Sequence, residues 1–238
     1  MSGVLPLFSS LVALAFALAV FDQYLDRRRP YQLVWSFGLL AYFVSTGAEF
    51  YTATWGVSGP AYRLWYMFGA VLTAAYLGMG TLYLLLPRRA AHIVFALLTI
   101  GSLLAIYKVA AAPLSLGELT PGATLSGAAF PRGWAGPRLL TPFFNIFGTL
   151  ALVGGAIYSA LAFYRRRVMP WRVTSNILIA AGAMLPAMGG SLARLGSPQY
   201  LYASELLGIV VIFAGFLRSR EVFGVYRVPF VGRKAAAK

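Results

Sequence analysis

Seven long apolar stretches dominate the sequence and limit what it can fold into. A bilayer has a hydrocarbon core about 30 Å thick, which about 20 mostly apolar residues cross as a helix. Only 11% of the residues are charged, whereas about a quarter are charged in an ordinary soluble domain. We therefore predict an all-α, polytopic membrane protein with seven transmembrane helices. The predicted spans are residues 4–25, 31–54, 61–86, 90–112, 139–164, 172–194 and 200–217.

Most of the basic residues fall in alternate connections between these spans. With all seven spans in place, 15 of the 20 Lys and Arg residues lie on one side of the membrane. Lys and Arg concentrate in cytoplasmic loops, so we predict that the N-terminus is outside, that the C-terminus is cytoplasmic and that the protein lies in the plasma (inner) membrane. The net charge of +14 then requires no nucleic-acid partner. The 15 residues are Arg27, Arg28, Arg29, Arg88, Arg89, Arg165, Arg166, Arg167, Arg172, Arg218, Arg220, Arg227, Arg233, Lys234 and Lys238.

The chain divides into one membrane domain and one short tail. Residues 1–220 form the predicted seven-helix domain, and residues 221–238 form a basic cytoplasmic tail that would contact membrane lipids or a protein partner. Residues 113–138 are rich in glycine and proline. We predict that this segment is an irregular external loop over the outer face.

The first three and last three predicted spans resemble each other. The "RRR" of residues 27–29 returns at 165–167, and "GPAYRLWYMFG" at 59–69 is echoed by "SPQYLYASELLG" at 197–208. This favours a 3+1+3 pseudo-repeat, an arrangement that places the substrate site of many transporters between the repeats. The alternative is that ordinary helix ends produce the match, with basic residues inside and aromatic residues and proline outside.

Strongly polar side chains recur near the outer ends of six of the seven predicted helices. Helical residues rise 1.5 Å each, so counting from the helix ends places these groups in the outer third of the membrane. Ionisable groups inside a membrane are costly unless paired or hydrated, and they often mark functional sites. We predict a ligand-binding pocket that opens outward. Its candidate residues are Glu49, Arg63, Tyr66, Lys108, Asn145, Tyr202 and Glu205.

In this hypothesis Glu49 and Glu205 are the anionic contacts to a small solute or a lipid headgroup. Arg63 and Lys108 act as counter-ions or as contacts to anionic ligand groups, while Asn145 and the two tyrosines orient the ligand. The alternative is a structural network in which the glutamates pair with these basic residues and no ligand binds.

Helical spacing places Glu49 on an interior face. Tyr42, Ser45, Glu49 and Thr52 are three or four residues apart, so they share one side of the second predicted helix. The tryptophans, by contrast, fit the belts that aromatic residues form at membrane interfaces. They are Trp35, Trp55, Trp65, Trp134 and Trp171.

Several chemistries lack the residues that they need. The chain has no cysteine and a single histidine, His92, which excludes thiolate sites, bis-histidine haem ligation and histidine-based metal sites. The seventh predicted helix has no lysine that could form a retinal Schiff base, and no glycine-rich phosphate loop precedes a Lys-Ser or Lys-Thr pair. We therefore predict neither an enzyme nor a cofactor.

Residues of about 31–89 and 200–230 resemble a known family. Within them, "AYRLWYMFGAVLTAAYLGMGTLYLLLPRR" at 61–89 and "ELLGIVVIFAGFLRSREVFGVYRVPF" at 205–230 look like parts of the seven-helix sensor region at the N-terminus of some bacterial membrane histidine kinases. The given sequence ends at Lys238 without a kinase domain. The resemblance therefore implies a sensing or receptor-like module that signals through a separate partner.

Two alternative functions stay open. The chain is also similar to small seven-helix sugar transporters built as 3+1+3, although their Pro-Gln helix motif is not reproduced, because Pro198-Gln199 lies in a predicted outer turn. Such a transporter would carry a polar solute. The other alternative is an accessory subunit of a larger membrane complex.

Overall fold

The structure is a computed structural model that describes residues 3–119, 124–167, 169–195 and 200–221. Within these ranges seven helical segments are long and apolar enough to cross a membrane. Two of them contain π-helical turns, η1 (Tyr66–Thr73) and η6 (Leu150–Gly154). The α-helices are α1 (Val4–Arg27), α2 (Pro30–Trp55), α3 (Gly59–Trp65), α4 (Ala74–Leu85), α5 (Arg88–Ala111), α6 (Thr141–Thr149), α7 (Gly155–Arg165), α8 (Pro170–Arg194) and α9 (Leu201–Glu221).

The predicted all-α membrane fold with seven spans is confirmed. The spans begin and end within a few residues of their predicted bounds. The third and fifth spans are continuous helical segments that include η1 and η6, respectively. The predicted loop 113–138 consists of short 3₁₀ turns and irregular chain where the structure describes it.

Local sequence explains two of the tight turns. Between α1 and α2, Arg28 ends α1 with a left-handed backbone at φ 51°, and Pro30 starts α2 where its missing N–H is harmless. Between α2 and α3, Gly56 has φ 92°, a conformation that favours glycine. The Ser58 side chain then caps α3 by accepting a hydrogen bond from the Ala61 N–H at 3.4 Å. These turns bring consecutive spans back across the bundle.

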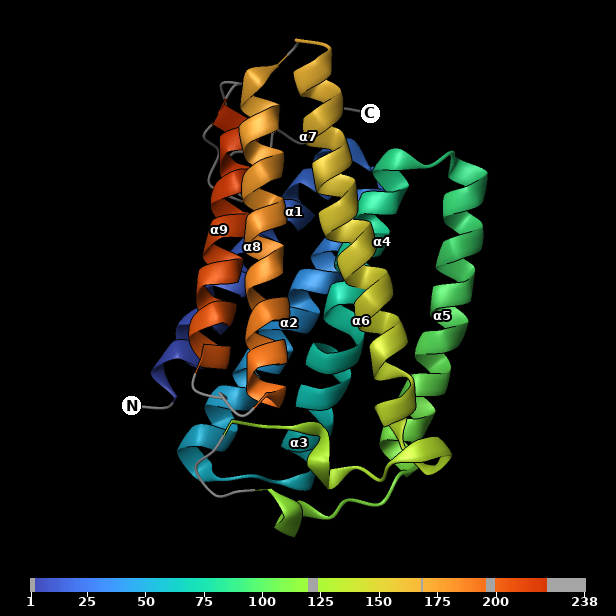
Figure 1. Cartoon of the computed structure of the whole chain (residues 1–238), viewed down its shortest axis with the longest axis vertical. Helices are drawn as coiled ribbons and strands as arrows, with labels where there is room; N and C mark the ends of the chain where they lie inside the picture. The colour runs from blue at the N-terminus through green and yellow to red at the C-terminus, as the bar shows by residue number, and fades with distance from the viewer. Residues whose placement is uncertain (1–2, 120–123, 168, 196–199, 222–238) are drawn as a thin grey trace, which may run out of the picture.

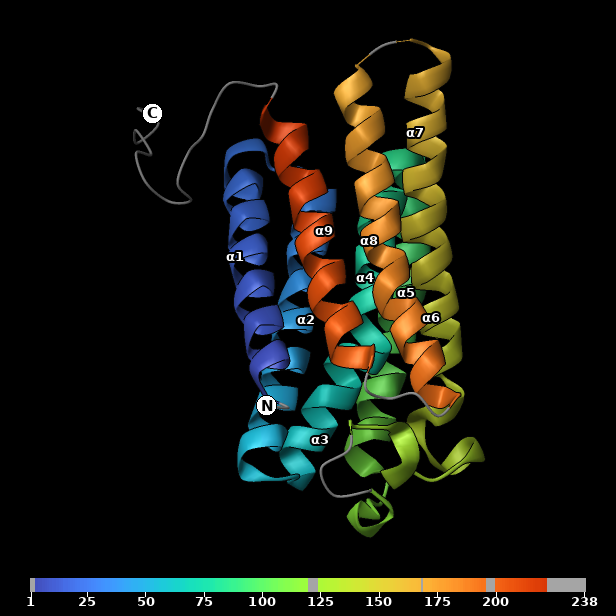
Figure 2. The same ribbon diagram turned by 60° about the vertical axis from the view of Figure 1, so that its left-hand side comes forward.

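Six of the spans form a closed ring. α1 packs on α2, α2 on α4, α4 on α6, α7 on α8, α8 on α9, and α9 returns to α1. α5 lies outside this ring and packs on α4 and η1. Figures 1 and 2 show the loop that follows α5 at the same end of the bundle as α3, whereas the α7–α8 turn lies at the opposite end. We call the first the loop end.

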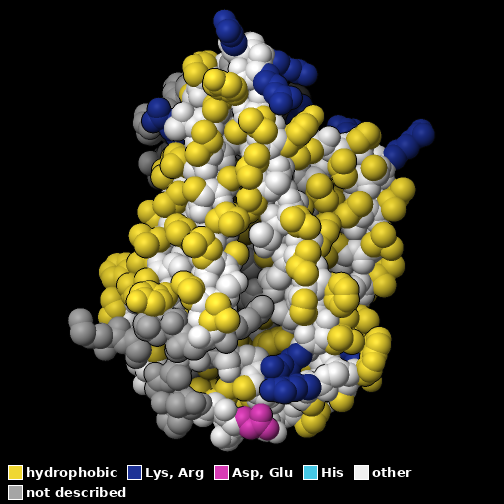
Figure 3. All heavy atoms as spheres, viewed as in Figure 1, with side chains coloured by type: hydrophobic (Ala, Val, Ile, Leu, Met, Phe, Trp, Pro, Cys, Tyr) yellow, Lys and Arg dark blue, Asp and Glu magenta, His cyan; other side chains and the backbone are white. Residues whose placement is uncertain are grey.

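Arginines gather at the opposite end of the bundle. The α1–α2, α4–α5 and α7–α8 turns carry them there, and we call this the arginine end. In Figure 3 dark blue side chains cluster at this end, and apolar side chains form a belt across the middle of the face in view. A smaller basic group with an acidic neighbour lies at the loop end. An apolar belt between two polar ends is typical of a membrane-spanning protein.

Glycines let the helices of the ring approach closely. A Cβ atom on Gly78 of α4 would lie 2.6 Å from the carbonyl oxygen of Gly148 in α6. A Cβ atom on Gly208 of α9 would lie 2.7 Å from the ring of Pro186 in α8. Small residues at such contacts are typical of packed membrane helices, because they let backbones touch. The ring therefore depends on glycine at these positions.

Candidate functional site

The two intramembrane glutamates meet inside the ring near its loop end. Glu49 lies on α2 and is 1% exposed, and Glu205 lies on α9 with its Oε2 atom shielded from solvent. Their carboxyl groups are within hydrogen-bonding reach of each other. The face predicted for the second helix is confirmed, since Tyr42, Ser45 and Thr52 are buried together with Glu49. We call Glu49 and Glu205 the acid pair.

The Trp65 indole holds one oxygen of the acid pair. Its Nε1–H donates a hydrogen bond to Glu49 Oε1 at 2.7 Å. No N–H or O–H of the described residues donates to Oε2 of Glu49 or to Oε2 of Glu205. Ionised carboxylates only accept hydrogen bonds, so a bond between the two carboxyl groups requires a proton on one of them. The acid pair therefore needs a proton or another cation.

Two tyrosines connect the acid pair to its surroundings. The Tyr42 hydroxyl of α2 donates to the backbone carbonyl of Glu205 at 2.9 Å and so joins α2 to α9. Tyr202 is half-buried, lies three residues before Glu205 and interacts electrostatically with both carboxyl groups. Together with Trp65 these rings give the acids an aromatic environment.

The loop after α5 covers this end of the ring. The Tyr62 hydroxyl donates to the Ser126 carbonyl at 2.6 Å, and the buried Phe130 ring lies 5.3 Å from the Tyr62 ring, centroid to centroid. The Tyr202 side chain also lies beside the backbone of Leu125 in the loop. The loop thus contacts the third and seventh spans at once and covers the acid pair from the loop end.

The Arg63 guanidinium binds the C-terminal end of α5. Its Nη1 donates to the Val109 carbonyl, and its Nη2 donates to the Ala112 carbonyl at 2.8 Å. The last carbonyls of a helix have no partner within the helix and carry partial negative charge, which a cation stabilises. Arg63 therefore fastens α5, which lies outside the ring, to α3.

Arg63→Ala is expected to lower the free energy of unfolding by about 2 kcal/mol, because hydrogen bonds to a charged group are lost. Thermal unfolding of the purified protein in detergent measures this loss. Arg132→Ala is the matched control, since Arg132 is exposed in the loop, and its effect is expected to stay within about 0.5 kcal/mol. Equal unfolding temperatures for the two variants would contradict the stabilising role of Arg63.

Three further candidates make other contacts at the loop end. Lys108 Nζ donates to a backbone carbonyl of the loop. Asn145 Nδ2 donates to the Ala70 carbonyl at 2.9 Å, inside the π-helical turn η1. The Tyr66 and Thr141 hydroxyls share a hydrogen bond of 2.8 Å. These contacts join the spans and the loop to one another.

The structure thus brings together three of the seven predicted site residues, Glu49, Tyr202 and Glu205. The sequence-based interpretation missed Trp65 and was wrong to place it in an interface belt, because its ring is buried beside Glu49. A signal for this contact exists in the sequence. Glu49 and Trp65 are equally far from Val57 in the turn between their helices, so an antiparallel hairpin places them at the same depth.

Glu49 of the acid pair is buried and Glu205 is partly buried, and two hollows of the described residues lie away from the pair. One of about 540 Å³ is bordered by Arg27, Arg29 and Tyr31 at the arginine end. The other, of about 550 Å³, lies between α7 and α8. None of the residues that border either hollow is a predicted site residue.

Two carboxyl groups with aromatic neighbours suit a singly charged cation. Among the described residues, no three Asp, Glu or His side chains come close enough to hold a metal ion together. A calcium ion takes six to eight oxygen ligands, more than the acid pair provides. An ammonium group, by contrast, carries one charge and donates several hydrogen bonds to such oxygens.

Comparisons with known proteins found no match. No protein-family model, no curated protein and no solved structure matches the chain.

Proposed function

We propose that the chain is a seven-helix sensor-like module of the plasma membrane, which binds a small organic ammonium ion at the acid pair and signals through a separate partner. The observation that carries this proposal is the meeting of two carboxyl groups whose Oε2 atoms have no donor among the described residues. The resemblance of residues of about 31–89 and 200–230 to the sensor regions of bacterial histidine kinases supports the sensor role.

Two properties of the site favour an organic ammonium ion. Its N–H groups supply hydrogen bonds to the carboxylate oxygens that lack donors, and its charge offsets theirs. Aromatic rings attract ammonium ions, and Trp65 and Tyr202 border the acids. The same chemical group occurs in free amines and in lipid headgroups such as ethanolamine, so either source fits the site.

Helix α9 offers a route from the site to the arginine end. Glu205 lies near its start and Arg218 near its end, about 20 Å apart at the helical rise. A ligand at the acid pair acts on the contact between α2 and α9 that Tyr42 makes with the Glu205 backbone. A movement of α9 caused by the ligand would then change the contact of α9 with a partner at the arginine end. The predicted tail 221–238 lies outside the described residues from position 222 onward.

The proposal also includes the orientation of the protein in the membrane and the 3+1+3 pseudo-repeat. The concentration of arginines supports a cytoplasmic position for the arginine end. The place of α5 outside the ring supports its role as the connector between two triplets of spans. Pro198, which matches Pro60 in the repeat, lies outside the described residues.

Single cysteines test the orientation, because the chain has none of its own. Trp134→Cys is expected to react with a membrane-impermeant maleimide in intact cells, and Arg166→Cys only after lysis. Trp134 is 81% exposed in the loop, and Arg166 is exposed in the α7–α8 turn. The opposite labelling pattern would place the acid pair near the cytoplasmic surface and overturn the proposed orientation.

Ammonium binding is tested with the protein in nanodiscs of phosphatidylglycerol, a lipid without an amine. Ethanolamine hydrochloride is expected to raise the unfolding temperature relative to sodium chloride at equal ionic strength and pH. A ligand at 100 times its Kd stabilises the folded state by about 2.7 kcal/mol. In a second arm phosphatidylethanolamine replaces part of the lipid, and a rise without added ethanolamine identifies the headgroup as the source. No rise in either arm would reject ammonium binding.

Other outcomes would favour the alternative functions. Uptake of labelled ethanolamine into proteoliposomes, lost in Glu205→Gln, would indicate a small 3+1+3 transporter. Stable co-purification with another membrane protein, combined with no ammonium binding, would indicate an accessory subunit.

A further inference from the structure

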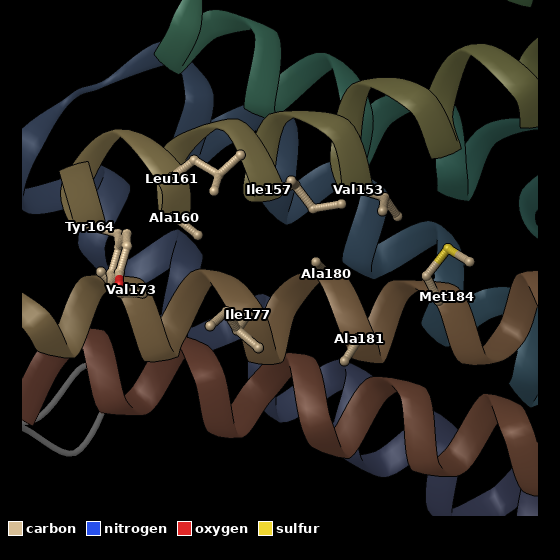
Figure 4. Close-up of a pocket in the computed structure, with 10 residues that line it drawn as sticks. All are labelled: Val153, Ile157, Ala160, Leu161, Tyr164, Val173, Ile177, Ala180, Ala181 and Met184. Carbon is tan, nitrogen blue, oxygen red and sulfur yellow. The ribbon is translucent and has the colours of Figure 1, made fainter.

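A groove between α7 and α8 lies on the apolar flank of the bundle, and none of the residues that line it belongs to the acid site (Figure 4). Ala160 and Ala180 are buried at its floor. Ile157, Leu161 and Ile177 are about half exposed beside them. Small residues therefore form the floor and larger ones the walls, and the groove opens toward the surrounding membrane.

The groove is about as long as one leaflet of the membrane. Val153 and Tyr164 mark its two ends on the fifth span, and Met184 and Val173 mark them on α8. On either side, the eleven residue steps from one end to the other cover about 16 Å at the helical rise. Half of a hydrocarbon core about 30 Å thick is about 15 Å. Tyr164 and Val173 lie at the arginine end, so the groove occupies the leaflet on that side.

The lining of the groove suits a hydrocarbon chain. The groove has a volume of about 550 Å³, and apolar side chains line almost all of it. A hydrocarbon chain that lies along the groove would contact these side chains over about 16 Å.

Four arginines stand where the groove meets the membrane surface. One directly follows Tyr164, and another directly precedes Val173. The guanidinium of the latter lies 5.3 Å from the centre of the Phe163 ring, and the other three are exposed in or beside the turn. Arginine binds phosphate oxygens with paired, charge-assisted hydrogen bonds. These arginines are Arg165, Arg166, Arg167 and Arg172.

We propose that this groove binds one acyl chain of an anionic phospholipid, whose phosphate is held by the arginines of the α7–α8 turn. The length of the groove, its apolar lining and the charge at its end match the two parts of such a lipid. Basic clusters at helix ends attract anionic headgroups. The bound chain would fill the space that α7 and α8 leave between them. This site is independent of the acid pair.

Native mass spectrometry of the full chain released from detergent tests the proposal. The protein is incubated with equal amounts of phosphatidylglycerol and phosphatidylcholine that carry identical acyl chains. The wild type is expected to retain phosphatidylglycerol about 10-fold over phosphatidylcholine, because arginines favour the anionic headgroup. The triple variant Arg165→Gln/Arg166→Gln/Arg167→Gln is expected to lose this preference. Ala181→Phe, which fills the groove at an exposed position, is expected to reduce retention of the anionic lipid at least fivefold.

Two controls separate the groove from general lipid contact. Arg88→Gln/Arg89→Gln removes arginines of another turn at the same end, and Ala110→Phe adds a ring to an exposed position of α5. Both are expected to keep the wild-type preference. Equal retention of the two lipids by the wild type, or an unchanged preference in both groove variants, would overturn the proposal. A dimer that disappears in Ala181→Phe without a change in lipid retention would also overturn it, because the groove would then be a contact between copies.

Discussion

The Glu205→Gln variant is expected to stay folded and to lose the ethanolamine-dependent rise in unfolding temperature. Its amide N–H donates a hydrogen bond to Glu49 without an added proton, so the pair stays connected. One of the two negative charges that attract an ammonium ion is gone, however. Removing one partner of a buried charged contact costs about 2 kcal/mol or more, so ethanolamine binding is expected to weaken at least about 30-fold. Thermal unfolding across an ethanolamine series in phosphatidylglycerol nanodiscs measures the change.

Two further variants test whether the loss of the ethanolamine response is specific to the acid pair. Glu118→Gln removes an exposed acid of the loop and is expected to keep the full ethanolamine response. Glu49→Gln is expected to lose the response as Glu205→Gln does, because either substitution leaves a single carboxylate at the pair. A wild-type response in both acid-pair variants would place the ammonium ion somewhere else on the protein.

Gly148→Ala is expected to lower the free energy of unfolding by about 3 kcal/mol, near the upper end of what overpacking costs. A Cβ atom on Gly148 would lie under 3.0 Å from the backbone carbonyl of Ala74 in α4, so α4 and α6 would have to separate. Alanine favours a helix over glycine by about 0.5–1 kcal/mol, so the expected loss runs against intrinsic helix propensity. Thermal unfolding in detergent measures it.

Gly154→Ala is the matched control on the same span. A Cβ atom on Gly154 would meet nothing within 4 Å, so only the helix preference acts. This variant is expected to be as stable as the wild type or slightly more stable. If Gly148→Ala were equally stable, the close approach of α4 and α6 would not contribute to the fold.

The spans and the position of Glu49 could be predicted from the sequence because both follow from periodicity. Apolar length determines how often the chain crosses the membrane. The spacing of Tyr42, Ser45 and Thr52 gives the face that Glu49 shares, and all four side chains are buried. Depth alone also brought Glu49 and Glu205 into one layer, where the structure joins them.

The partners of the basic residues could not be predicted in the same way. Arg63 and Lys108 lie at the depth of the acids, yet they bind backbone carbonyls of α5 and of the loop. Counting residues from a helix end gives the position of a side chain along the membrane normal. It does not give the direction in which the side chain points around its helix. Nor does it show which backbone carbonyls at a helix end or in a π-helical turn are free to accept a hydrogen bond from a side chain. Asn145 binds a carbonyl in such a π-helical turn.

Solid-state NMR tests the ammonium site most directly. The protein is labelled with ¹³C at the side-chain carboxyl carbons of its four glutamates, which are Glu49, Glu118, Glu205 and Glu221. It is then loaded with ¹⁵N-ethanolamine, and dipolar dephasing identifies the carboxyl groups next to the amine. We expect dephasing of two carboxyl signals in the wild type, and the signal that is missing from Glu49→Gln or from Glu205→Gln assigns each of them. Dephasing of the Glu118 or Glu221 signal alone, or of none, would contradict ammonium binding at the acid pair.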